Sequence, residues 1–216
     1  MKIASSSLDT VQAYKLLSGI VVPRPIAWIT SRSSDTVVNL APFSCYTFVS
    51  SNPPMVGFNV GKKISGAKDT PTNIMRTGEY VVNIADHTMI ANVHRSSGEF
   101  SAHESEVDLL GLKTTPGELV DCPRLSDVPV SMECRYVSST PFGRGNTQFI
   151  VGEVVVFHIR DDLYDNGKIH TEKLQPICRI AGPNYATLGP IVSQTSSGTW
   201  GPGNTVARWE KTEQNH

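Results

Sequence analysis

The sequence predicts a closed antiparallel β barrel with small helical insertions. The first half consists of short segments rich in β-forming residues, separated by turns that contain Pro, Gly and Asn. Two longer strand patterns follow at residues 130–137 and 148–159. The regular strand–helix alternation of a doubly wound α/β fold is missing, which favours a mainly β barrel.

The early strands are expected in chain order. Residues 25–30 form the first strand, the polar residues 31–36 form a turn, and residues 37–40 form the return strand. Residues 43–49 form another strand, which ends at the breaker Asn52-Pro53-Pro54, and residues 55–60 follow it. These segments predict hairpins of neighbouring strands.

Helix signals interrupt this pattern at residues 68–78. Asp69 or Thr70 can cap a helix start, Pro71 suits the first turn, and Gly78 suits the stop. We expect a strand at 79–84, a short helix at 86–95 and a surface loop at 96–105. The strand at 148–159 is almost continuously apolar, which predicts that both its faces are covered.

Length and composition favour one globular domain. The 216 residues suit a single domain at 1–192, and the Gly-, Ser- and Thr-rich residues 193–216 suggest a tail that is loose or packed on a partner subunit. The net charge of −1 gives no basic footprint for nucleic acid, and no apolar run could span a membrane. No signal core precedes residue 8, and the four cysteines form no CxxC pair. We therefore expect a cytoplasmic protein with reduced thiols, and neither a nucleic-acid nor a membrane partner.

Two of the candidate stretches are rich in proline. Arg24 lies between two prolines, whose stiff backbone makes it a good anion or carbonyl ligand, although a solvated arginine at a strand start has the same pattern. In the segment 39–45, Ala41 and Ser44 would let a planar ring approach the backbone. A simple turn into a strand is the ordinary explanation of that segment.

Three further stretches carry polar groups. The helix start at 68–73 could bind a phosphate through its N–H groups, although an ordinary capped helix has the same pattern. His170 follows the tight-turn signal Asn166-Gly167 and is either a proton donor or a solvated side chain. The segment 176–185 places one Arg and one Tyr beside glycine turns.

Common cofactor signatures are missing. The chain has neither a Gly-x-Gly-x-x-Gly nor a Walker sequence, so the two common nucleotide folds lose support. His87, His94 and His103 lack metal-ligand spacing, so we expect no metal site. Nothing supports an activated Cys45–His170 pair.

Taken in order, these motifs resemble the flavin reductase-like, FMN-binding split-barrel family. The resemblance covers roughly residues 14–190, and the late segments at 167–170 and 176–182 resemble its longer flavoprotein branch. The early motifs that carry it are Arg24-Pro25-Ile26-Ala27-Trp28, Asn39-Leu40-Ala41-Pro42-Phe43-Ser44, Asn52-Pro53-Pro54, Lys68-Asp69-Thr70 with Asn73-Ile74, and Glu79-Tyr80-Val81-Val82-Asn83.

The resemblance implies a six-stranded Greek-key split barrel, a homodimer and FMN held near the subunit interface. Residues 24–27 would line one edge of the flavin, residues 39–44 would meet the ring and its ribityl chain, and residues 68–70 would lie at the phosphate. His170 resembles a histidine placed beside the ring, although its spacing from the glycine differs from that in the short reductases. The implied cofactor-binding residues are Arg24, Pro25, Ile26, Ala27, Asn39, Ala41, Pro42, Ser44, Lys68, Asp69, Thr70 and Asn73.

The function implied by the resemblance is an NAD(P)H:flavin oxidoreductase. It would transfer hydride from NADH or NADPH to FMN and supply reduced flavin to a flavin-dependent monooxygenase or another acceptor. The added length after residue 160 motivates an alternative, a flavoenzyme that keeps FMN as a prosthetic group and acts directly on a small organic substrate. A flavin-binding electron carrier is the non-enzymatic alternative.

Overall fold

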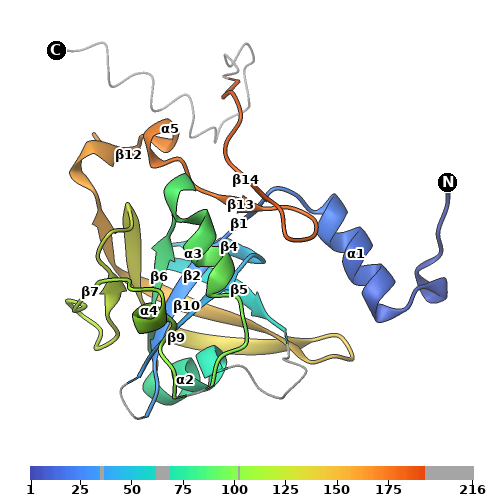
Figure 1. Ribbon diagram of the computed structural model, residues 1–216, viewed down its shortest axis with the longest axis horizontal. Helices are drawn as coiled ribbons and strands as arrows, with labels where there is room; N and C mark the ends of the chain where they lie inside the picture. Colours follow the sequence, from blue (N-terminus) through green and yellow to red (C-terminus); the bar gives the residue numbers. More distant parts are fainter. Residues whose placement is uncertain (35–36, 62–68, 102, 193–216) are drawn as a thin grey trace.

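A seven-stranded antiparallel sheet forms the body of the molecule (Figure 1). The computed structural model describes residues 1–34, 37–61, 69–101 and 103–192. The strand order is β3-β2-β6-β9-β10-β5-β4. The strands are β2 (Ala27–Arg32), β3 (Val38–Phe43), β4 (Tyr46–Ser51), β5 (Pro54–Val60), β6 (Glu79–Ile84), β9 (Val130–Phe142) and β10 (Thr147–Ile159).

The resemblance implied six strands, and the sheet has seven. The additional strand arises because β4 pairs with β5 as a hairpin at one end of the strand order. The expected strand at 43–49 is wrong at its start, since β3 continues to Phe43 and a bend at residues 44–45 precedes β4. The helix expected at 68–78 is confirmed as α2 (Asp69–Thr77), and Gly78 follows it with a φ of 75°.

Alternating side chains divide the sheet into two apolar faces. Inside the barrel, Phe58 packs against Tyr80 with ring centroids 5.8 Å apart, and Ala27 belongs to the same cluster. On the outside, Trp28 and Leu40 pack in a second cluster, beneath the helical insertions. The period of two along β2 and β3 therefore predicts which side chains face outward and can line an external cleft.

The helix α1 (Thr10–Ile20) was not predicted. Asp9 and Gln12 form a capping box at its start, and this spacing is a recognisable helix-start signal in the sequence. None of its residues is buried, and it projects from the barrel (Figure 1). The remaining helices are α3 (Ile90–Arg95), α4 (Glu106–Leu109) and α5 (Thr171–Leu174), with short 3-10 turns η1 (Ser5–Ser7), η2 (His87–Met89) and η3 (Asp161–Leu163).

Short strands complete the fold. The Asn166-Gly167 turn is confirmed, with φ values of 45° and 81°, in the hairpin of β11 (Tyr164–Asp165) and β12 (Lys168–Ile169). Phe157 is 51% exposed, so the expectation that both faces of 148–159 are covered is wrong for that residue. The other short strands are β1 (Arg24–Pro25), β7 (Thr114–Thr115), β8 (Arg124–Leu125), β13 (Cys178–Arg179) and β14 (Tyr185–Ala186).

The four thiols are free, and all except Cys45 are buried. Burial raises the pKa of both Cys122 and Cys134 to about 12, so neither is an activated thiolate. Among the described residues, no helix has the length and apolar character needed to cross a membrane.

Candidate functional site

A cleft of about 160 Å³ opens on the outside of the barrel, and we call it the outer cleft. Ile26, Pro42 and Ser44 line it, so the structure brings together three of the predicted cofactor residues. The Ser44 hydroxyl makes no hydrogen bond within the described part of the chain. The other lining residues are Tyr14 of α1, Ser97, Arg179 and Tyr185.

An aromatic and cationic wall closes one side of the outer cleft. The Arg179 Nη1 donates to the Tyr185 hydroxyl at 2.6 Å, and the guanidinium carbon lies 4.6 Å from the centre of the Tyr185 ring. His94 Nδ1 is 3.3 Å from the same hydroxyl. This wall offers an aromatic surface and a positive charge, which suits a planar ring that carries or gains negative charge. The sequence stretch at 176–185 contains this Arg and Tyr beside glycine turns, whereas nothing in the spacing of His94 indicates that it lies at the same place.

Arg24 supports the outer cleft from behind. Its side chain is buried, and Nη1 donates to the carbonyl oxygens of Ser18 and Val21, each at 2.6 Å. Nη2 donates to the carbonyl oxygen of Ile180 at 3.3 Å. Arg24 thereby joins the end of α1 to the strand β13, which carries Arg179. Pro25 is exposed, and Ala27 faces the barrel interior.

Three of the predicted cofactor residues, Asn39, Thr70 and Asn73, belong to a buried polar network. The Asn39 Nδ2 donates to Glu106 Oε1 at 2.8 Å, and the Thr70 hydroxyl donates to Asn39 Oδ1 at 2.8 Å. Asn73 Nδ2 donates to the Ser31 hydroxyl at 3.2 Å. These side chains are all buried, so their bonds position the start of α2 against β2 and β3. Glu106 is a residue that the sequence reasoning missed.

Burial dominates the electrostatics of this network. It raises the pKa of Glu106 despite hydrogen bonds from the Leu40 backbone and the Asn39 side chain. The negative charge of Asp69 raises it further. Asp69 and Thr70 belong to the first turn of α2, where backbone N–H groups attract anions. Lys68, expected beside them, lies outside the described residues.

The strand β3 connects these two regions. Asn39 in the polar network and Pro42 in the outer cleft are three residues apart, which is about 10 Å along a strand. Ala41 packs against the interior cluster between them. The arrangement provides a cleft with aliphatic, aromatic and polar walls near one end of β3 and a helix start near the other.

His170 lies away from these groups. It precedes α5, and its Nε2 is 3.9 Å from an oxygen of the Asp165 carboxylate. It does not line the outer cleft. The described residues contain no group of three His, Cys, Asp or Glu side chains that could hold a metal ion.

A mainly β barrel with an aromatic external cleft defines a class of small cofactor-binding proteins. The family described as flavin reductase like domain matches residues 18–173. The chain belongs to this flavin reductase-like family and has its split-barrel fold.

Similar proteins agree with this assignment. An uncharacterized protein of Halalkalibacterium halodurans is 39% identical over 89% of this chain and 95% of its own. The structure of nitrilotriacetate monooxygenase component B from Bacillus cereus has a TM-score of 0.86 and 34% identity, covering 90% of this chain and 98% of that one. The structure of the 2-nitrobenzoate 2-nitroreductase NbaA from Pseudomonas fluorescens has a TM-score of 0.84 and 30% identity, covering 94% and 100%.

Proposed function

We propose that this protein is an NAD(P)H:flavin oxidoreductase that transfers hydride from a nicotinamide to FMN. The observation that carries the proposal is the outer cleft, which Ile26, Pro42 and Ser44 line together with Tyr185. The similarity to component B of a monooxygenase supports a role in supplying reduced flavin to a partner oxygenase. Localisation in the cytoplasm is part of the same proposal.

The residues of this chain fit FMN in three respects. The outer cleft offers aromatic and aliphatic walls for a flat ring, and the unpartnered Ser44 hydroxyl can bond a polar ring edge. The first turn of α2 offers N–H groups to a phosphate. Asn39 and Thr70 fix that turn relative to β3.

Bound FMN would supply the hydride acceptor at its N5 atom. The protein would then contribute position and environment: Pro42 and Tyr185 would confine the ring, and Ser44 would orient its edge. Arg179, held by the Tyr185 hydroxyl, would place a fixed positive charge beside the ring. His170 does not line the outer cleft of its own subunit, and we propose it as the histidine beside the nicotinamide. His170→Ala should then lower turnover without weakening FMN binding.

The proposal includes a homodimer. At about 160 Å³ the outer cleft of one subunit is smaller than the 300–1,000 Å³ of ordinary ligand pockets. The helix α1, which supplies Tyr14 to the cleft, buries none of its residues and exposes Leu17 and Ile20 by 62% and 74%. A second copy that covers α1 would enlarge and close the cleft.

An FMN-prosthetic enzyme acting directly on a small organic substrate is the second candidate. The similarity to a 2-nitrobenzoate 2-nitroreductase favours it. The two candidates differ in how firmly FMN is held. FMN that survives extensive dialysis, together with poor turnover of free flavin, supports the second candidate.

The test is flavin binding and flavin-dependent turnover. Wild-type protein should quench FMN fluorescence on titration and oxidise NADH or NADPH in proportion to added FMN. Ser44→Ala should weaken FMN binding severalfold, because it removes one hydrogen bond worth about 1 kcal/mol. Ser138→Ala, an exposed serine of β9, is the matched control and should change nothing. A protein that neither binds FMN nor oxidises nicotinamide in its presence contradicts both candidates.

A further inference from the structure

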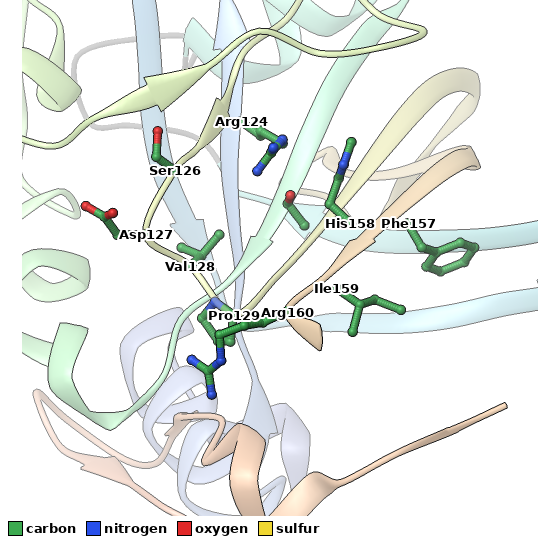
Figure 2. A pocket seen from close by; sticks show the side chains of 10 residues that line it. Arg124, Ser126, Asp127, Val128, Pro129, Phe157, His158, Ile159 and Arg160 are labelled. Atoms are coloured by element: carbon green, nitrogen blue, oxygen red, sulfur yellow. The ribbon is translucent and has the colours of Figure 1, made fainter. Parts of the chain in front are cut away.

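A second and larger pocket, of about 510 Å³, lies where β8 and the loop after it meet the ends of β9 and β10 (Figure 2). We call it the β9–β10 pocket. It shares no lining residue with the outer cleft. Its lining residues are Arg124, Ser126, Asp127, Val128, Pro129, Ser131, Phe157, His158, Ile159 and Arg160.

Two polar atoms in this pocket are buried without a partner. The Ser131 side chain is 1% exposed, and its hydroxyl makes no hydrogen bond in the described part of the chain. The Arg124 Nε is also buried and has no hydrogen-bond partner in the described part of the chain. Buried polar atoms in folded proteins are nearly always hydrogen-bonded, because an unsatisfied one costs about 1–3 kcal/mol. Two such donors in one wall therefore point to a ligand that accepts hydrogen bonds.

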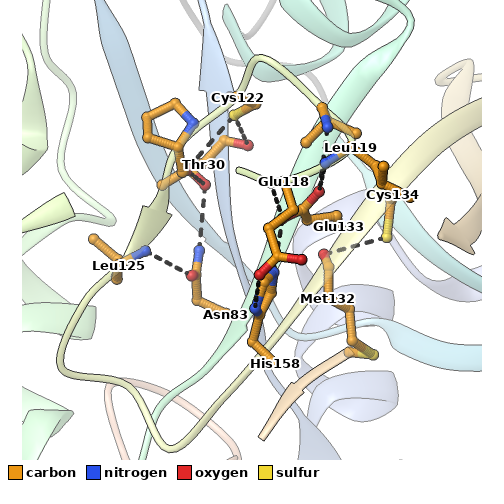
Figure 3. Close-up of polar contacts among 12 residues, drawn as sticks. Thr30, Asn83, Glu118, Leu119, Cys122, Leu125, Met132, Glu133, Cys134 and His158 are labelled. Carbon is orange, nitrogen blue, oxygen red and sulfur yellow. Dashed lines mark hydrogen bonds and ion pairs between the residues drawn. The ribbon is translucent and has the colours of Figure 1, made fainter. Parts of the chain in front are cut away.

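The histidine beside them is held in place. His158 lies directly opposite Ser131 in the β9–β10 pairing, and its Nε2 is 2.7 Å from Glu133 Oε1 (Figure 3). Glu133 is fully buried and also accepts from the backbone N–H groups of Glu118 and Leu119, each at 2.7 Å. These bonds fix the His158 ring, so this wall of the pocket is preorganised rather than flexible.

The charges favour an anion. Arg160 is bound by Asp162 at 2.6 Å, whereas the Arg124 side chain forms no hydrogen bond or ion pair with the described residues. Asp127 is the one carboxylate among the lining residues, and because Asp162 neutralises Arg160, Arg124 is the arginine left to bind an anion. Figure 2 shows the Arg124 and His158 side chains near one another, with Arg160 farther along the pocket. Arg124 can therefore receive a carboxylate through the planar fork of its guanidinium.

The rest of the lining is apolar. Val128, Pro129 and Ile159 contribute aliphatic surface next to the polar wall. We propose that the β9–β10 pocket binds a small organic carboxylate, with its carboxylate on Arg124 and Ser131 and its apolar body on these residues. The volume suits a molecule of that size.

The pocket lies at the same level of the sheet as the outer cleft. The pairings Pro42–Trp28, Trp28–Asn83 and Asn83–Ser131 form one continuous row across β3, β2, β6 and β9. The separation is three strand spacings, about 14 Å along the sheet. The carboxylate site is thus separate from the proposed flavin site, and its existence does not depend on flavin binding.

The test is calorimetric titration of the full-length protein with sodium benzoate, with and without saturating FMN. We expect saturable binding in both cases, and none with the neutral analogue benzyl alcohol. Arg124→Gln should weaken benzoate binding at least tenfold, whereas Arg144→Gln, an exposed arginine in the β9–β10 turn, should leave it unchanged. Ser131→Ala should weaken binding and leave the thermal stability of the free protein equal or higher, because it removes an unsatisfied hydroxyl.

Three results would overturn the proposal. They are no saturable binding at millimolar benzoate, equal affinity in Arg124→Gln and wild-type protein, and loss of binding when FMN saturates the protein. The last result would place benzoate in the outer cleft. Failure of FMN to bind would count against the proposed function and leave this site standing.

Discussion

The Thr70 hydroxyl donates a 2.8 Å hydrogen bond to Asn39 Oδ1, which ties the first turn of α2 to the beginning of β3. Asn39 also donates to both carboxylate oxygens of Glu106, at 2.8 and 3.1 Å. One amide thus links α2, β3 and α4 within a space closed to water. Both residues are predicted cofactor contacts, and in the structure their bonds hold the surrounding elements in register.

Asn39→Ala should destabilise the protein by about 2–3 kcal/mol, because it removes hydrogen bonds from a buried carboxylate and leaves that carboxylate less well satisfied. Urea unfolding followed by circular dichroism measures the change. Asn59→Ala, at an exposed position of β5, is the matched control and should stay within about 0.5 kcal/mol of wild type. Equal stability of the two variants would contradict a structural role for Asn39.

The two buried glutamates should show opposite pH dependence. The raised pKa of Glu106 means that its contribution to stability is present below the ordinary pKa of about 4.3 and is lost as the pH rises through the folded-state pKa. For Glu133, burial alone would raise the pKa, but the backbone groups of Glu118 and Leu119 and the His158 side chain lower it overall. Its contribution is therefore present above about 4.3 and is lost as the pH falls through the lowered pKa.

Stability measured by urea unfolding across the acidic range separates these contributions. Relative to wild type, Glu106→Gln should gain stability as the pH rises above the ordinary glutamate pKa. Glu133→Gln should lose stability relative to wild type over the rise from the lowered pKa to the ordinary one. Parallel curves for wild type and both variants would show that neither carboxylate titrates differently in the folded protein.

Arg24→Ala should reduce both thermal stability and FMN affinity. Removal of the buried guanidinium leaves the carbonyl oxygens of Ser18, Val21 and Ile180 without their donor and frees α1 from the back of the outer cleft. We expect a loss of at least 2 kcal/mol and weaker FMN binding in fluorescence titration. Arg24→Lys keeps the positive charge but loses the planar guanidinium with its several donors. It should therefore retain only part of the stability and part of the FMN affinity that Arg24→Ala loses. Weaker FMN binding with full stability would instead make Arg24 a direct ligand.

Gly152→Ala should destabilise the barrel by about 1–3 kcal/mol through overpacking. An added Cβ would lie within 3 Å of the Tyr80 ring, which is fully buried. Gly61→Ala, where an added Cβ meets nothing within 4 Å, is the control for glycine replacement. Thermal unfolding of the two variants compares them, and a neutral Gly152→Ala would mean that the Tyr80 side chain repacks at little cost.

Much of the barrel could be predicted from local patterns. Local sequence patterns predict three strands and one helix that the structure confirms, at 79–84, 130–137, 148–159 and 69–77. The capping residues and Gly78 mark the two ends of the helix. The bend at residues 44–45 could not be predicted, because both residues are compatible with a strand. It arises because β3 pairs with β2 up to Phe43, whereas β4 pairs with β5 from Tyr46 onward. α1 was missed although Asp9 and Gln12 signalled its start.

The candidate site could be predicted only in part. Ile26, Pro42 and Ser44 lie at the outer cleft as the motifs indicate. Glu106 and His94 could not be placed from the sequence, because their partners are more than sixty residues away along the chain. Whether a residue lines the cleft or supports a residue that does depends on packing between segments far apart in the sequence. The spacing of residues along the chain does not predict such packing.

The Arg24 guanidinium has a practical consequence for shortening the chain. Deleting the first twenty-one residues would look harmless, since α1 has no buried side chain, yet it would strip two of the three acceptors from an enclosed cation. The smallest fragment worth expressing therefore begins before Asp9, and fusion partners belong ahead of that residue rather than at the edge of the barrel.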